Sequence, residues 1–139
     1  MTLGDLLFQE IGKLTSSKTM LESIEPTAEI SGMGNFTYKD VNVTTHWTTL
    51  VTLKNYGKSY SKGKGIMYAD NNEVATYAIN GISKQNSQTG GSTTRGMSMV
   101  STGSDSNGGK LSLLNDTIAV YEFDQDHEGN YTAKIWEWK

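Results

Sequence analysis

Apolar and polar residues alternate along most of this chain in short segments, and clusters of Gly, Asn and Asp separate the segments. The clearest segment is 41–54, where Val43, Trp47 and Val51 share one face and His46 lies on the other. Its many β-branched residues and its period of two are typical of a strand and argue against a helix. The strongest turn signals fall at 55–57, 70–72, 86–91, 105–109 and 126–130. The pattern therefore predicts a succession of antiparallel strands.

Counting the segments between turn signals predicts eight strands, at 6–15, 28–40, 41–54, 59–69, 73–84, 92–102, 111–123 and 131–138. One short helical turn is expected near 20–25, because Met20, Leu21 and Ile24 have helical spacing and Pro26 ends the run. The fold class is therefore all-β, and 139 residues correspond to one domain covering 1–139.

Eight antiparallel strands in so short a chain favour a closed up-and-down barrel. A sandwich of two sheets is the main alternative, since sandwiches are also built from short strands. The barrel is preferred because the segments follow one another with short connections. In addition, the glycine pairs Gly32/Gly34 and Gly63/Gly65 allow strands to bend as closure requires.

The composition supports a folded protein without a strong electrostatic partner. Hydrophobic residues make up 35% of the chain and the mean hydropathy is −0.49, which suits a single-layer barrel whose outer wall faces water. Seven Tyr, three Trp and three Phe argue against disorder. The net charge of −3 provides no field for phosphate backbones, so no nucleic-acid partner is expected. The local lysines 54, 58, 62 and 64 are interpreted as a solvated turn.

Several kinds of chemistry are not expected from this sequence. There is no Cys, hence no disulfide and no thiolate ligand. The two histidines have no carboxylate at ligand spacing, so no metal site is predicted. Motifs for dinucleotides, for phosphate-binding loops and for serine nucleophiles are also missing, so no cofactor is expected. No apolar run approaches the ~20 residues of a membrane helix, and the start of the chain does not resemble a secretory leader, so a cytoplasmic protein without a membrane partner is expected.

The candidate site residues are those with large or ionisable side chains within predicted strands. His46 and Glu10 are weak candidates for a general acid or base, and the competing interpretation is that each simply faces water or plays a structural role. Arg95 shares a face with two methionines, so an inward Arg95 could anchor a carboxylate. The residues expected to line an interior are Trp47, Tyr77, Met97, Met99 and Trp136. Because several strands carry apolar residues on both faces, a homo-oligomer, dimer or trimer, is also expected.

Three stretches together resemble a known group of proteins: Gly63-Lys64-Gly65-Ile66, Glu73-Val74-Ala75-Thr76-Tyr77 and the terminal Ile135-Trp136-Glu137-Trp138. Their order is similar to that of the small calycin-type barrels related to allene oxide cyclase and dirigent proteins. The resemblance implies an eight-stranded antiparallel barrel, an apolar cavity and frequently a trimer. It matches no individual functional residue, so no catalytic residue is carried over to this chain.

Three functions remain open at this point. The first is binding of a small, largely apolar or amphipathic molecule inside the barrel. The second is an isomerase or cyclase of the same fold, and the third is a structural or interaction module whose interior is filled by side chains. A cavity would separate the first two from the third, and a buried ionisable pair beside that cavity would favour the enzyme.

Overall fold

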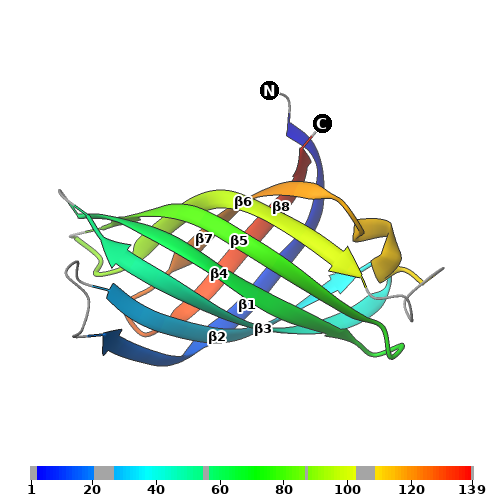
Figure 1. Cartoon of the computed structure of the whole chain (residues 1–139), viewed down its shortest axis with the longest axis horizontal. Helices are drawn as coiled ribbons and strands as arrows, with labels where there is room; N and C mark the ends of the chain where they lie inside the picture. Colours follow the sequence, from blue (N-terminus) through cyan, green and yellow to red (C-terminus); the bar gives the residue numbers. More distant parts are fainter. Residues whose placement is uncertain (1–2, 21–26, 55–56, 87, 103–108, 139) are drawn as a thin grey trace.

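The computed structural model describes residues 3–20, 27–54, 57–86, 88–102 and 109–138, and its eight strands form a closed antiparallel barrel in chain order (Figure 1). Each strand pairs with the next one, and β1 pairs with β8 to close the wall. The prediction of a closed up-and-down barrel is confirmed, and the two-sheet sandwich is wrong. The strands are β1 (Leu3–Met20), β2 (Thr27–Tyr38), β3 (Val41–Leu53), β4 (Lys58–Ala69), β5 (Val74–Gln85), β6 (Ser92–Thr102), β7 (Ile118–Gln125) and β8 (Asn130–Trp138).

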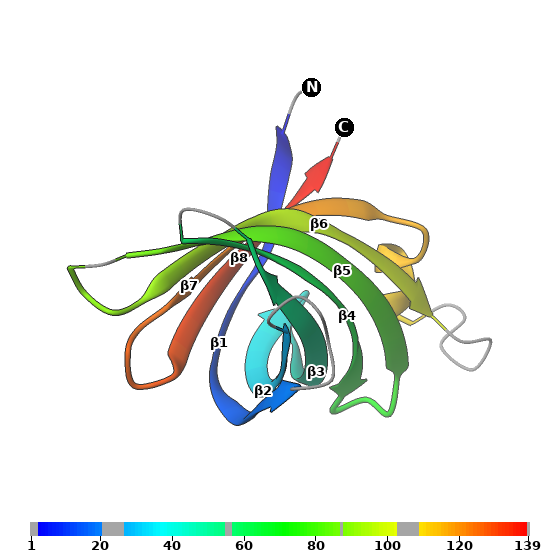
Figure 2. The same cartoon turned by 60° about the vertical axis from the view of Figure 1, so that its left-hand side comes forward.

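The two ends of the barrel differ in how their strands are connected. At one end, Lys39 and Asp40 form a two-residue turn between β2 and β3, and both have positive φ, as a type I′ hairpin turn requires. The only short helix of the described residues, η2 (Leu111–Leu114), lies at this same end, which we call the η2 end (Figures 1 and 2). At the opposite end, which we call the Gly57 end, β3 connects to β4 and β5 connects to β6.

The segment before β7 differs from the prediction. The sequence predicts one strand over 111–123, but residues 111–114 form the 3₁₀-helix η2 and β7 begins at Ile118. Leu111 and Leu114 are three residues apart, so they lie on one side of a 3₁₀-helix, and both are buried while Leu113 is exposed. Burial of these two leucines therefore overrides the strand pattern. The helical turn predicted near 20–25 falls largely outside the described residues, and Met20 belongs to β1.

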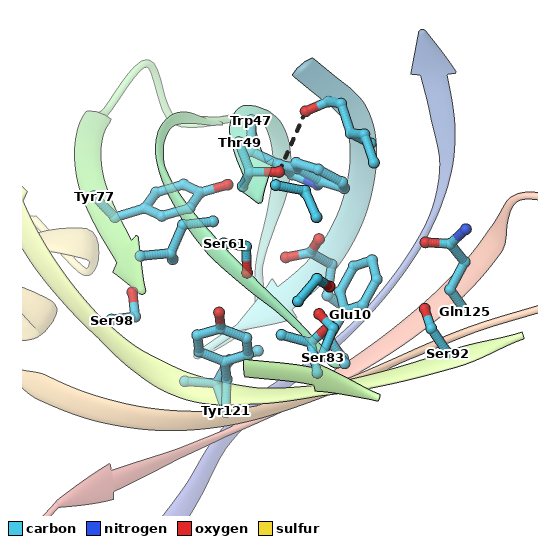
Figure 3. Close-up of a pocket in the computed structure, with 18 of the residues that line it drawn as sticks. Glu10, Trp47, Thr49, Ser61, Tyr77, Ser83, Ser92, Ser98, Tyr121 and Gln125 are labelled. Atoms are coloured by element: carbon cyan, nitrogen blue, oxygen red, sulfur yellow. Dashed lines mark hydrogen bonds between the residues drawn. The ribbon is translucent and has the colours of Figure 1, made fainter. Parts of the chain in front are cut away.

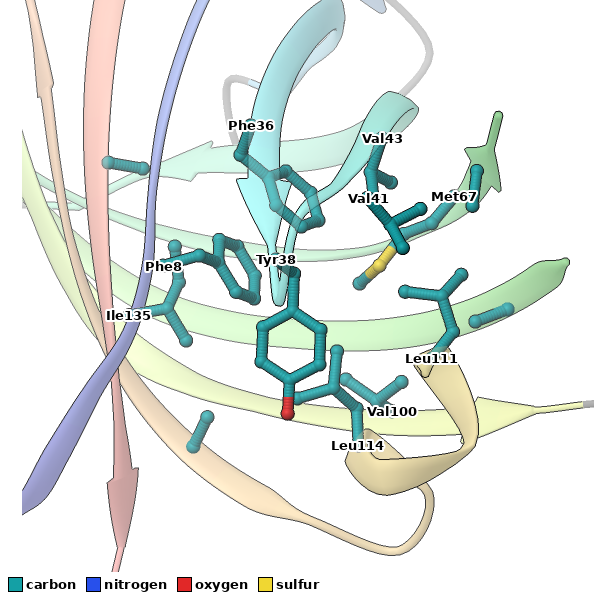
Figure 4. Close-up of a cluster of buried hydrophobic side chains, with 14 of the residues drawn as sticks. Phe8, Phe36, Tyr38, Val41, Val43, Met67, Val100, Leu111, Leu114 and Ile135 are labelled. Carbon is teal, nitrogen blue, oxygen red and sulfur yellow. The ribbon is translucent and has the colours of Figure 1, made fainter. Parts of the chain in front are cut away.

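A cluster of apolar side chains closes the η2 end (Figure 4). Phe8 and Phe36 are stacked, with ring centroids 3.8 Å apart, and Tyr38 meets Phe8 edge-on. Leu111 and Leu114 of η2 point toward this cluster and are at most 1% exposed. Full burial of a leucine contributes about 2 kcal/mol, so these two side chains help to hold η2 against the barrel.

Glycines on the inner wall make room for aromatic rings on neighbouring strands. The strand register places Gly32 opposite Trp47 and Gly65 opposite Tyr77. A Cβ atom on Gly32 would lie 2.6 Å from Cε2 of Trp47, and a Cβ atom on Gly65 would lie 2.7 Å from Cε1 of Tyr77. The glycine pairs were predicted to allow bending, and the structure shows that they also leave the space in which the interior rings lie.

Within the described ranges, no helix has the length and apolar character needed to cross a bilayer.

Candidate functional site

The barrel encloses a cavity of about 450 Å³ (Figure 3). This volume lies within the range of small-molecule sites, roughly 300 to 1,000 Å³. The cavity reaches the Gly57 end, where Gly57, Gln85 and Leu53 line it and are exposed to solvent. The apolar cluster and η2 close the opposite end. As built from the described residues, the barrel is therefore a cup with one mouth, at the Gly57 end.

Two kinds of side chain form most of the cavity wall. Apolar and aromatic groups come from several strands, and they include Ile30, Trp47, Val51, Tyr77, Ile79 and Phe123. Small hydroxyl groups line β4, β5 and β6, and they include Ser59, Ser61, Ser83, Ser92, Thr94 and Ser98. Tyr77 and Tyr121 point into the space from β5 and β7 (Figure 3). Such a wall suits a largely apolar molecule with few polar atoms.

Glu10 on β1 is the one ionisable acid of the cavity wall, and no Lys, Arg or His of the described residues lines it. Its side chain is buried, with the residue only 8% exposed. The hydroxyl of Tyr131, on β8, donates a hydrogen bond to Oε2 of Glu10. In turn, the indole Nε1 of Trp47 donates to the Tyr131 hydroxyl over 3.0 Å. Three distant parts of the chain thus converge on a single carboxyl group.

Aromatic packing fixes the side chains of Trp47 and Tyr131, which form these hydrogen bonds, in place. The Tyr131 ring stacks on Phe123, with centroids 4.5 Å apart, and Trp47 meets both rings edge-on at 5.7 Å. Tyr77 is held separately, through a hydrogen bond between its hydroxyl and that of Thr45. Because these groups are packed and bonded, the carboxyl group they surround has a defined position.

Burial controls the ionisation of this site. Desolvation raises the pKa of Glu10 to about 7, and the hydrogen bond from Tyr131 only partly opposes this rise. Burial and the nearby charge of Glu10 raise the pKa values of Tyr77 and Tyr131, so both remain neutral hydrogen-bond donors. Burial also raises the pKa of Tyr121 to about 12, although a hydrogen bond with Ser61 lowers it slightly. Glu10 is thus the group of the site that can change its charge near neutral pH.

The structure places three of the predicted site residues around the cavity. Trp47 and Tyr77 contribute rings to its wall, and Glu10 contributes its carboxyl group. The sequence had left open whether Glu10 faces water or the interior, and it faces the interior. A role for these residues in binding or catalysis stays a prediction.

Four of the predicted site residues lie on the outer surface instead. Met97 and Met99 are 47% and 57% exposed, and the side chain of Arg95 is 77% exposed and forms an ion pair of 3.2 Å with Glu122. Trp136 alternates with the buried Ile135 and pairs with Val120 outside the cavity. The prediction of Met97, Met99 and Trp136 as lining residues is therefore wrong. On β6 the prediction placed the apolar face inside, and the role considered for an inward Arg95 falls with it. The inward face of β6 instead carries small residues such as Thr94 and Ser98, opposite the large rings.

His46 also lies outside the cavity. It is exposed on β3. Among the ring contacts of the described residues, His46 makes one, edge-on with Tyr68 and with centroids 6.3 Å apart. Its position excludes it as an acid or base inside the barrel. In the described part of the chain, no three His, Asp or Glu side chains lie close enough together to hold a metal ion.

The sequence reasoning missed Tyr121, Phe123 and Tyr131. A usable signal was present on β7, where Glu122 and Asp124 mark the outward face and thereby assign Tyr121 and Phe123 to the interior. Tyr131 carries no such local signal, because its role depends on Glu10, which lies at the other end of the chain and becomes its neighbour only when β8 closes against β1.

Solved structures share this fold over nearly the whole chain. A protein of unknown function from Clostridium acetobutylicum ATCC 824 superimposes with a TM-score of 0.79 at 12% identity, over 100% of both chains. A conserved protein of unknown function from Rhodopseudomonas palustris gives a TM-score of 0.77 at 10% identity, over 99% of this chain and 98% of the other. A beta-barrel like protein from Acinetobacter baumannii AYE gives a TM-score of 0.78 at 13% identity, over 99% of this chain and 96% of the other. At such low identities the likeness establishes the β-barrel fold alone.

No protein-family profile matches this sequence, and no curated protein matches it.

Proposed function

We propose that this protein binds a small, largely apolar molecule inside its barrel. The observation that carries the proposal is the cavity of about 450 Å³, which has an apolar and aromatic wall, scattered hydroxyl groups and one mouth. The same observation argues against a purely structural module, because a barrel filled by its own side chains would leave no such space.

A neutral fluorescent probe tests this proposal. N-phenyl-1-naphthylamine brightens in apolar surroundings, and we expect saturable brightening with the wild-type protein. Ile79→Trp should weaken it, because Ile79 lines the cavity and a larger indole there takes up part of the space. Ile82→Trp is the matched control, since Ile82 is on the same strand but 51% exposed. Equal binding by both variants would show that the probe lies outside the barrel.

Proton-transfer catalysis, as in an isomerase or cyclase of the kind that the sequence resembles, is the second candidate. Its support is the buried Glu10, whose raised pKa suits a general acid or base and whose carboxyl group borders the cavity beside Tyr131. A bound ketone such as 2-octanone would then exchange its α-protons in D₂O faster with wild-type protein than with Glu10→Gln, measured by NMR. Equal exchange rates would remove Glu10 from this role.

A further inference from the structure

The charge on the cavity wall restricts what can bind there. A molecule entering this cavity meets aromatic rings, hydroxyl groups and a single carboxyl group, and no cationic side chain of the described residues lines the wall. A ligand with a carboxylate would be brought close to Glu10 without a partner for either charge. The one arginine considered as an anchor, Arg95, lies outside and is paired with Glu122. Anionic ligands are therefore disfavoured.

Glu10 retains an oxygen atom for a ligand. Tyr131 donates to Oε2, and among the described residues no hydrogen bond to Oε1 is found. Glu10 lines the cavity, so Oε1 is the oxygen atom of this carboxyl group that is left for a bound molecule. A carboxyl group that is 8% exposed, fixed on one side and open on the other is prepared to accept a hydrogen bond from a bound molecule.

The surroundings of that oxygen favour a cation. The rings of Trp47, Tyr77 and Tyr121 border the same cavity, and faces of such rings attract ammonium groups. The titratable groups that face Glu10 are Tyr131 from β8 and Tyr77 from β5, and both stay neutral. No Lys, Arg or His of the described residues lines the cavity to compete with a cation for this site.

We propose that the molecule bound in this cavity is an apolar amine, with its ammonium group hydrogen-bonded to Glu10 and its hydrocarbon part against the aromatic wall. This inference rests on the proposed function, since it names the chemical class of the ligand for the same cavity. The neutral form of Glu10 cannot pair with the cation, so binding of the amine is coupled to loss of the proton from the carboxyl group.

Three probes of equal length distinguish the possibilities: octylamine, 1-octanol and octanoate, titrated by calorimetry at pH 8. We expect octylamine to bind about tenfold or more tightly than octanol, which is the effect of one charge-assisted hydrogen bond, and octanoate to bind most weakly. In Glu10→Gln, octylamine should lose its advantage over octanol, and binding of octanol to the variant shows that it is folded. Glu29→Gln, which alters an exposed acid on β2, is the matched control and should behave as wild type.

The pH dependence gives a second measurement that requires no variant. Octylamine stays protonated below a pH of about 10, as a lysine side chain does. Its affinity for the wild-type protein should fall roughly tenfold per pH unit below about 7, whereas the affinity of octanol stays constant.

The possible failures are distinguishable. If octanol binds and octylamine binds no better, or if octanoate binds best, the amine inference is wrong and the proposed function stands. If Glu10→Gln leaves the preference for octylamine intact, the amine does not lie against Glu10 and the inference is wrong. If none of the three probes binds, both the proposed function and the inference are contradicted.

Discussion

At the scale of single residues, Glu10 is the unusual feature of this protein. Burying a carboxyl group costs stability unless it is neutral or well bonded, and Glu10 receives only one hydrogen bond from the described residues, from Tyr131. Its pKa is raised to about 7 for that reason. A residue that is costly to the fold and borders a cavity is a candidate for a functional group.

The stability of the protein should depend on the ionisation of Glu10. Its folded pKa of about 7 lies above its ordinary value of 4.5, so the folded state binds the proton more tightly than the unfolded state. The corresponding stabilisation is complete below about pH 4.5 and is lost as the pH rises through about 7. The difference between the folded and the ordinary pKa of Glu10 corresponds to about 3 kcal/mol in the free energy of unfolding. Urea unfolding of wild type and Glu10→Gln between pH 4.5 and 8 measures it.

Subtracting the free energy of unfolding of the variant from that of the wild type at each pH removes the contributions of the other carboxyl groups. The wild type should lose stability relative to Glu10→Gln across this range. A constant difference would mean that Glu10 has an ordinary pKa in the folded protein.

At the scale of elements, a second buried acid holds the helix η2 in place. The carboxylate of Glu73, which precedes β5, accepts hydrogen bonds from the backbone N–H groups of Lys110 and Leu111 at 2.8 and 2.9 Å. The side-chain amide of Asn71 also donates to it. Glu73 therefore anchors the start of η2, and Leu111 and Leu114 can close the end of the barrel.

Removing that carboxylate should destabilise the barrel. In Glu73→Ala the two backbone N–H groups lose their partner, and we expect a loss of about 2 to 3 kcal/mol in the free energy of unfolding, measured in urea. Glu29 is an exposed acid on β2, and Glu29→Ala should change the free energy of unfolding by less than about 0.5 kcal/mol. A similarly small effect of Glu73→Ala would mean that the leucines alone hold η2.

At the scale of the whole molecule, the outer wall carries an apolar row. Outward residues of four adjacent strands are in register: Met97 pairs with Val120, Val120 with Trp136, and Trp136 with Leu6. A contiguous apolar row of this kind on the outer wall offers a face for association. We propose that this row is where copies of the chain associate, which is the homo-oligomer expected from the sequence.

Native mass spectrometry tests this proposal. The wild type should give a dimer or trimer, and Met97→Glu should shift the population to monomer because it buries a charge in the contact. Leu50→Glu is the matched control, since Leu50 is an outward apolar residue on β3, 45% exposed and outside the row. A wild-type monomer, or equal loss of oligomer in both variants, would contradict the proposal.

The arrangement of strands is largely a local property, and it could be predicted from the sequence. The period of two in 41–54 and the turn signals at 55–57, 70–72, 86–91, 105–109 and 126–130 were sufficient to predict eight strands, because alternation and turn chemistry depend on neighbouring residues alone. The short connections and the glycine pairs favoured a barrel over a sandwich, and the pairing of β1 with β8 closes it. The strand predicted over 111–123 was wrong at its start, since the burial of Leu111 and Leu114 against a distant cluster decides that segment.

The inner surface of the barrel was decided by the tertiary structure. Met97 and Met99 are more apolar than Thr94 and Ser98, yet the smaller residues face inward, which leaves the interior to the rings of other strands and to the cavity. The site itself joins Glu10, Trp47 and Tyr131, which are separated by most of the chain length. Their contact and the raised pKa of Glu10 exist only after β8 has closed against β1, since closure both brings the groups together and removes them from water.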